Sequence, residues 1–199
     1  MTDIFIPVHL SAVKEWIRWQ PRLNQIPFDG LEWCVDDLCS ANEDEIQNLL
    51  IKMKHDYPTK QIGVRTNHSQ FKWRELVDFI NISYDQHPSI DERTILRISI
   101  QNVAEMEHYA HFLTPQQPKA ICFEVMTTSM MELLDYLAMC HSFAGQFTLE
   151  DKGGGQSFIQ RLAPYFHLAY VDAVACHCSL AERNELTSSE LEQLWKEGL

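Results

Sequence analysis

Residues 120–138 read AICFEVMTTSMMELLDYLA, and this stretch contains the structural unit that recurs along the whole chain. Its first seven residues form an apolar run of the length expected for a buried β-strand. Apolar residues then recur with helical spacing, at Met130, Leu133, Leu134 and Leu137. The stretch therefore predicts a strand followed directly by an amphipathic helix.

The same alternation of apolar runs and helical patterns continues on both sides of this stretch. The other predicted strands are residues 4–8, 31–35, 61–65, 79–83, 95–100, 143–149 and 167–175. Helices are predicted after most of them, including one capped by Asn42 and a last one opened by the capping box of Thr187 and Glu190. Eight such units predict a compact TIM-type (β/α)8 barrel, with an open doubly wound sheet as the alternative. A length of 199 residues fits one domain spanning residues 1–199.

Charge and hydropathy exclude several classes of partner. The chain has 16 Lys and Arg against 28 Asp and Glu, a net charge of −12. Nucleic acids and anionic membranes require a basic face, so neither is an expected partner. A small anion requires only one or two local arginines. The sequence contains no apolar run of about 18 residues and no basic, apolar leader, so we expect a cytoplasmic protein.

The six cysteines predict neither a disulfide framework nor a metal site. We expect them to be mostly reduced, because disulfide scaffolds are typical of shorter secreted chains. Cys176-His177-Cys178 has a metal-like composition, but alternation along a strand places His177 on the face opposite both thiols. Since no second cluster with ligand spacing accompanies it, we expect no metal and no other cofactor.

In a barrel of this type the reactive groups lie at the carboxyl ends of the strands. The polar candidates there are Glu32, Cys34, Asp36, Arg65, Asn81, Ser83, Arg97, Ser99, Gln101, Cys122 and Glu124, with Arg161 in a following helix. We interpret Arg97 and Glu124 as a buried ion pair, because buried charges must be paired. Arg65 and Arg161 are expected to bind an anionic ligand, because guanidinium groups match carboxylates.

Taken in order, seven stretches resemble the type I 3-dehydroquinate dehydratases over almost the whole chain. In the first half of the chain, FDGLEWCVD (28–36) resembles the family's E-W-R-x-D, IGVRT (62–66) resembles F-R-[ST], and LVDFINIS (76–83) resembles V-D-x-I-D-x-E. Next, ISIQN (98–102) resembles S-x-H-D, and AICFEVM (120–126) resembles K-I-A-V-M. Towards the end, QRLA (160–163) resembles S-R-L-A, and residues 182–191 resemble A-P-G-Q-x-S-x-x-x-L. Such enzymes are eight-stranded α/β barrels. They usually carry a segment before the first strand that closes the barrel bottom, and no such extension is expected here.

The resemblance implies a dehydration through an imine, in which a lysine attacks the substrate ketone and a histidine, oriented by a glutamate, moves protons. This sequence has Cys122, Gln101 and Ser83 at those three positions. A glutamine cannot act as a base, and a thiol forms no imine. The positions that hold substrate in the family are retained as Glu32, Arg65 and Arg161. We therefore expect a degenerate barrel that binds a small hydroxylated carboxylate of the shikimate or quinate type.

Three alternatives remain open on the sequence alone. The first is an active dehydratase that uses Lys119, which follows a proline as the reactive lysine does in some family members; Lys152 is a weaker substitute. The second is an enzyme of another specificity with Cys122 or Cys34 as nucleophile, although no histidine is placed predictably beside either. The third is a non-catalytic interaction or regulatory protein. A homodimer is compatible with the sequence, which does not fix the oligomeric state.

Overall fold

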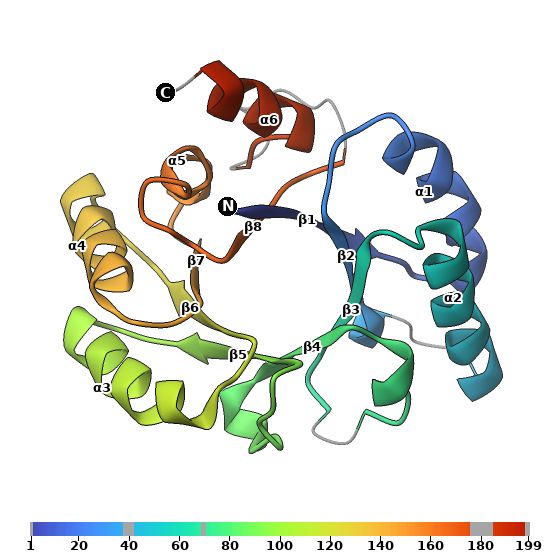
Figure 1. The fold of residues 1–199 in the computed structure, drawn as a ribbon, viewed down its shortest axis with the longest axis horizontal. Helices are drawn as coiled ribbons and strands as arrows, with labels where there is room; N and C mark the ends of the chain where they lie inside the picture. The colour runs from blue at the N-terminus through green and yellow to red at the C-terminus, as the bar shows by residue number, and fades with distance from the viewer. Residues whose placement is uncertain (1, 38–41, 69–70, 176–184, 198–199) are drawn as a thin grey trace.

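The computed structural model describes residues 2–37, 42–68, 71–175 and 185–197, whose strands form a barrel (Figure 1). The strands are β1 (Asp3–His9), β2 (Gly30–Cys34), β3 (Gln61–Thr66), β4 (Phe79–Ser83), β5 (Thr94–Ser99), β6 (Ala120–Val125), β7 (Phe147–Asp151) and β8 (Tyr170–Asp172). They are hydrogen-bonded in parallel in the order β7-β6-β5-β4-β3-β2-β1-β8. The pairing of β1 with β8 excludes an open doubly wound sheet.

The remaining seam, between β7 and β8, is joined by only a few hydrogen bonds. The amide of Ala169 donates to the carbonyl of Phe147 at 2.6 Å, and the Thr148 hydroxyl donates to the carbonyl of Tyr170 at 2.7 Å. The barrel is therefore nearly closed, and the predicted TIM-type fold is confirmed.

Six α-helices surround the barrel in the described part of the chain (Figure 1). They are α1 (Trp16–Leu23), α2 (Glu43–Asp56), α3 (Val103–Leu113), α4 (Met130–Ser142), α5 (Gln156–Leu162) and α6 (Ser188–Glu197). The predicted caps are confirmed: the Asn42 side chain accepts from the amide of Glu45 at 3.0 Å, and Thr187 and Glu190 cap each other's backbone. Among these helices, none is long and apolar enough to cross a membrane.

The expectation of eight complete strand-plus-helix units is wrong at two connections. In the described residues of the connections after β3 and β4, the chain forms only the single 3₁₀ turns η3 (Arg74–Leu76) and η4 (Tyr84–Gln86). The segment after β4 contains Pro88 and charged residues but no apolar stripe of helical spacing, so no helix can bury a face there. The other 3₁₀ turns are η1 (Val13–Glu15), η2 (Val35–Asp37) and η5 (Thr114–Gln116).

Two predicted strands differ from the observed strands by more than one residue at an end. Strand β7 begins at Phe147 instead of residue 143, because α4 continues to Ser142 and the chain needs a connection before the strand. Strand β8 is shorter than the predicted 167–175. The Cys176-His177-Cys178 triplet lies outside the described residues.

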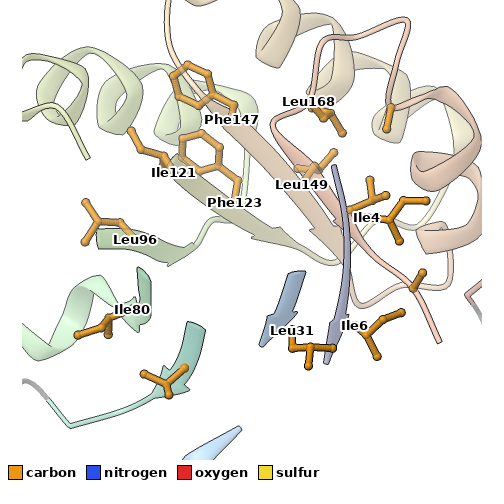
Figure 2. Close-up of a cluster of buried hydrophobic side chains, with 14 of the residues drawn as sticks. Ile4, Ile6, Leu31, Ile80, Leu96, Ile121, Phe123, Phe147, Leu149 and Leu168 are labelled. Atoms are coloured by element: carbon orange, nitrogen blue, oxygen red, sulfur yellow. The ribbon is translucent and has the colours of Figure 1, made fainter. Parts of the chain in front are cut away.

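Alternating side chains of the strands fill two separate cores. Outward-facing residues such as Ile6, Leu31 and Phe123 pack beneath the helices (Figure 2). A smaller apolar cluster from alternating strand positions comprises Phe5, Phe79, Ile95, Ala120, Cys122 and Tyr170. The rings of Phe5 and Phe79 meet edge to face, with centroids 5.2 Å apart. The barrel interior is therefore packed at this level, and the polar groups lie nearer the carboxyl ends of the strands.

Candidate functional site

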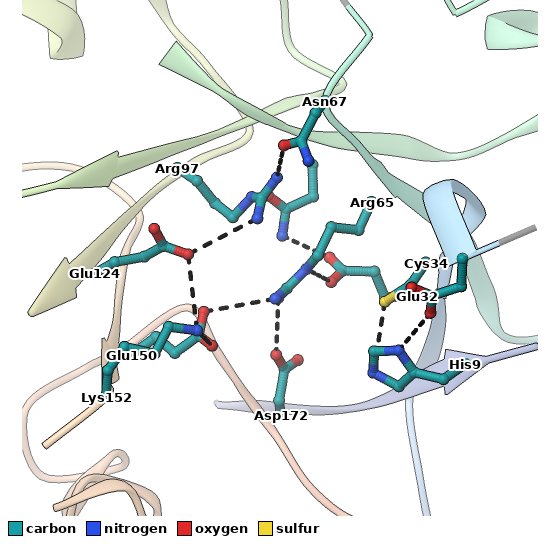
Figure 3. A network of polar contacts seen from close by, with 12 residues as sticks. His9, Glu32, Cys34, Arg65, Asn67, Arg97, Glu124, Glu150, Lys152 and Asp172 are labelled. Carbon is teal, nitrogen blue, oxygen red and sulfur yellow. Dashed lines mark hydrogen bonds and ion pairs between the residues drawn. The ribbon is translucent and has the colours of Figure 1, made fainter. Parts of the chain in front are cut away.

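Arg65 is the centre of a cluster of charges at the carboxyl ends of the strands (Figure 3). It lies on β3, and only 17% of its side chain is exposed. Its Nε donates to Glu32 at 2.5 Å, and its two terminal nitrogens lie 3.0 Å from Asp172 and 3.6 Å from Glu150. Three strands thus direct a carboxylate at one guanidinium, which is the arrangement that a buried charge requires.

A second group of charges adjoins the first on β5, β6 and the end of β7. Arg97 lies 3.8 Å from Glu124 and donates to the side-chain oxygen of Asn67 at 3.0 Å. Lys152 hydrogen-bonds Glu150 and lies 3.9 Å from Glu124, so it joins the two groups (Figure 3). The predicted pairing of Arg97 with Glu124 is confirmed.

Negative charge exceeds positive charge in this cluster. Four carboxylates, those of Glu32, Glu124, Glu150 and Asp172, face three cations, those of Arg65, Arg97 and Lys152. Several buried polar atoms also have no hydrogen-bond partner within the described protein: Asn81 Oδ1, Arg97 Nε, Glu150 Oε2 and Asp172 Oδ1. The cluster therefore offers three hydrogen-bond acceptors and one donor to a ligand. Its excess of carboxylates disfavours the binding of an anion beside these atoms.

The excess of carboxylates shifts pKa values within the cluster. Burial raises the pKa of Asp172 well above its ordinary value of 3.8, and the negative charges of Glu32 and Glu150 raise it further against the opposing effect of Arg65. Burial also acts to raise the pKa of Glu150, but Arg65 and Lys152 outweigh it and hold that pKa below its ordinary value. Asp172 consequently keeps its proton to a higher pH than an ordinary aspartate does.

We expect Asp172→Asn to stabilise the protein at neutral pH and to flatten the pH dependence of its stability. The folded state keeps the Asp172 proton to a higher pH than the unfolded chain does, so folding takes up a proton and stability falls as the pH rises. One group contributes a slope of at most about 1.4 kcal/mol per pH unit. Urea unfolding of the wild type and of the variant from about pH 5 to 8 measures how steeply the free energy of unfolding depends on pH in each protein. Identical slopes would contradict the raised pKa of Asp172.

The three residues expected at the positions of the family's lysine, histidine and glutamate are not joined to one another. Cys122 is buried in the barrel interior, Gln101 is exposed after β5, and Ser83 is half-buried at the end of β4. No hydrogen bond links their side chains in the described part of the chain. Burial raises the pKa of the Cys122 thiol well above its usual range, with Glu150 adding to the effect and Arg65 opposing it.

The two lysines proposed as alternatives lie at opposite ends of the barrel. Lys119 directly precedes β6 and lines a cavity of about 150 Å³ among residues at the starts of strands, with Asp3 and Tyr170. Lys152 follows β7 and belongs to the charge cluster. The structure thus brings Lys152, and not Lys119, to the carboxyl ends where barrel chemistry takes place.

The three residues expected to hold substrate are only partly brought together. Glu32 is fully buried and binds Arg65, and its second oxygen accepts from Asn81 at 2.7 Å. Arg161 is exposed on α5 and has no ion pair or hydrogen bond to any residue of the described ranges. Arg65 is occupied by carboxylates, so its expected role in binding an anion stays a prediction.

Cys34 has a histidine beside it, which could not be predicted from the sequence. His9 and Cys34 are register partners on β1 and β2, and Sγ lies 3.7 Å from His9 Nε2. The other ring nitrogen of His9 lies 2.6 Å from a carboxylate oxygen of Asp37. Burial raises the pKa of the Cys34 thiol to about 12, with Arg65 opposing this and Glu32 and Asp37 adding to it.

Sequence reasoning missed Glu150, Asp172 and the contact of His9 with Cys34. Glu150 was missed because the predicted β7 ended at Leu149, one residue before it. Glu150 lies two residues after Thr148 and therefore faces the same side of the sheet, so a correct strand end would have placed it among the candidates. Asp172 carried no such signal, because its partner Arg65 is 107 residues away in the chain.

The sequence matches no protein-family model and no curated protein. Among solved structures the fold is similar to the type I 3-dehydroquinate dehydratase of Clostridium difficile, with a TM-score of 0.80, 13% identity, and coverage of 98% of this chain and 92% of that one. The 3-dehydroquinate dehydratase of Geobacillus kaustophilus gives a TM-score of 0.79 at 11% identity, covering 99% and 91% of the two chains.

Barrels of other activities are also similar, though less so. A truncated 3-deoxy-D-arabino-heptulosonate 7-phosphate synthase of Thermotoga maritima gives a TM-score of 0.64 at 11% identity, covering 99% of this chain and 84% of that one. At such identities the likeness is one of fold. The chain therefore has the fold of a type I dehydroquinate dehydratase, and its chemistry has to be argued from its own residues.

Proposed function

We propose that this protein is a catalytically degenerate dehydroquinate dehydratase-like barrel that binds a small hydroxylated carboxylate of the quinate or shikimate type. The observation that carries the proposal is the environment of Cys122, the residue at the position of the family's lysine. Its side chain is buried in the barrel interior, and burial keeps its thiol protonated. A thiol forms no imine, and Gln101 cannot move a proton.

The charge cluster supports a ligand rich in hydroxyl groups. Asn81, Glu150 and Asp172 each present a buried oxygen that accepts no hydrogen bond within the described protein. Leaving such an atom unsatisfied costs about 1–3 kcal/mol, so a ligand that donates hydrogen bonds gains from all three. Ring hydroxyls are donors of this kind, and they bring no charge into a cluster with an excess of carboxylates.

The carboxylate of the ligand requires a cation outside the cluster. Arg161 is exposed on α5, and the stretch QRLA that contains it resembles the family's S-R-L-A pattern. Its guanidinium can form two parallel hydrogen bonds with a carboxylate. We infer that Arg161 holds this group while the cluster around Arg65 receives the hydroxyls.

Calorimetry with quinate, shikimate and 3-dehydroquinate tests the binding. We expect heat of binding with quinate or shikimate and weaker binding of the methyl ester of quinate, which keeps the hydroxyls but loses the charge. Arg161→Ala should weaken quinate at least about tenfold, as loss of a charged hydrogen bond does, and leave the ester unchanged. Arg18→Ala, on an exposed arginine of α1, is the matched control. No heat with any of the three acids would contradict the proposal.

A second candidate, an active lyase with a displaced lysine, rests on the position of Lys152 beside Glu124 and Glu150. Lys119 supports it less, because it lies at the other end of the barrel. A purely regulatory or interaction role stays a prediction from the sequence. Ligand binding without turnover separates the main proposal from the lyase, and binding of any of these acids separates it from the interaction role.

A further inference from the structure

His9, Cys34 and Asp37 form a group of metal-ligand side chains beside the charge cluster. Parallel pairing places His9 opposite Cys34, and Sγ lies 3.7 Å from Nε2 of the ring. Asp37 lies in the turn η2, directly after β2, and its carboxylate is 2.6 Å from Nδ1. Figure 3 shows the Cys34 and His9 side chains together at the edge of the network.

The three donor groups lie close together. A sulfur, a ring nitrogen and a carboxylate oxygen from these residues all lie within 4.8 Å of one another. The thiol contacts Nε2 and the carboxylate contacts Nδ1, as in a nucleophile–histidine–carboxylate relay, but in a relay the two groups lie on opposite sides of the imidazole and are farther apart than they are here. The short distance between them is typical instead of ligands that surround a common atom.

The distances fit a tetrahedral cation of the zinc type. Zinc binds sulfur at about 2.3 Å and histidine nitrogen at about 2.0–2.1 Å, so two such ligands at a tetrahedral angle are about 3.6 Å apart. Cys34 Sγ and His9 Nε2 are separated by 3.7 Å. Movement of the exposed Asp37 carboxylate, 42% of whose side chain is accessible, would complete the set.

We propose that His9, Cys34 and Asp37 bind a zinc-type divalent cation, with the fourth position open to an oxygen ligand. Three protein ligands and one open position are typical of catalytic zinc sites. As the metal–sulfur bond forms, the thiol proton leaves to solvent, and the thiolate and carboxylate together balance the two charges of the ion. This proposal departs from the sequence-based expectation of no metal, because the three residues match none of the usual ligand spacings.

The ligands of the proposed site are reachable from solvent. His9 is exposed over 63% of its side chain, so an ion can reach the site from solvent. Because Cys34 pairs in register with Arg65, the open position adjoins the cluster assigned to the hydroxylated ligand. The metal site does not depend on that assignment.

Cobalt and zinc titrations of the full reduced chain test the site. We expect one Co²⁺ per chain, with the near-ultraviolet charge-transfer band of a cobalt–thiolate bond, and loss of this band when one equivalent of Zn²⁺ is added. Cys34→Ser should abolish the band. His9→Ala should weaken Zn²⁺ binding, measured by calorimetry, at least about tenfold. Because His9 is largely exposed, this variant should keep its fold, which circular dichroism verifies.

Two controls make the experiment decisive. His111→Ala removes another exposed histidine, on α3, and should leave the affinity for Zn²⁺ unchanged. The double variant Cys176→Ser/Cys178→Ser should retain the cobalt band. The proposal is overturned if no band forms, if the band persists in Cys34→Ser, or if it disappears only in the double variant.

Discussion

Replacing Arg65 by methionine is expected to reduce the free energy of unfolding by about 3–5 kcal/mol, because it leaves buried carboxylates without their counter-ion. Glu32 is fully buried and receives a 2.5 Å hydrogen bond from Arg65. Asp172 and Glu150 lose the same cation. Typical domains are stable by about 5–15 kcal/mol, so the loss is a large part of the total. Urea unfolding monitored by tryptophan fluorescence measures it.

Lys72→Met is the matched control for this experiment. Lys72 also pairs with a carboxylate, that of Glu43, but both side chains are more than 60% exposed. Removing an exposed pair changes stability by no more than about 1 kcal/mol. If Arg65→Met were as mild as Lys72→Met, the cluster would contribute nothing to folding, and its carboxylates would have to be neutral.

Gly63→Ala is expected to destabilise the barrel by about 1–3 kcal/mol through overpacking. Gly63 faces the barrel interior, and a Cβ atom there would overlap the ring of Phe79. Phe79 is fully buried and packs against Phe5, so it has little room to move. Urea unfolding of the variant measures the cost.

A double-mutant cycle shows whether the Phe79 ring is the cause. Phe79→Leu removes the ring atoms that the new Cβ would meet, so Gly63→Ala should cost less in that background than in the wild type. Contacting residues give coupling energies of about 0.5–3 kcal/mol. Equal costs in the two backgrounds would mean that Gly63 is required for another reason.

The strands were predictable because burial leaves a strong pattern in the sequence. For β4 the predicted bounds equal those of the structure. The error came from extending the repeat to connections that do not contain it. After β4 the chain has no apolar stripe, and in the described residues after β3 and β4 3₁₀ turns stand in place of helices.

The candidate site was predictable only where the signal is local. The place of a single residue on its strand is enough to predict each of Glu32, Arg65, Arg97 and Glu124 as a site residue. Their pairing partners depend on closure of the barrel, which brings Asp172 of β8 to Arg65 of β3. The His9–Cys34 contact depends in the same way on the register of two strands. Neither can be read from the spacing along the chain.

Borohydride trapping tests the central claim, that this barrel retains the fold of the dehydratases without their imine chemistry. The protein is incubated with 3-dehydroquinate and sodium borohydride, and its intact mass is compared with that of a sample treated without the ligand. Our account predicts equal masses, since no lysine occupies the position of Cys122. A reduced adduct, mapped by peptide mass to Lys152, Lys119 or any other lysine, would contradict it.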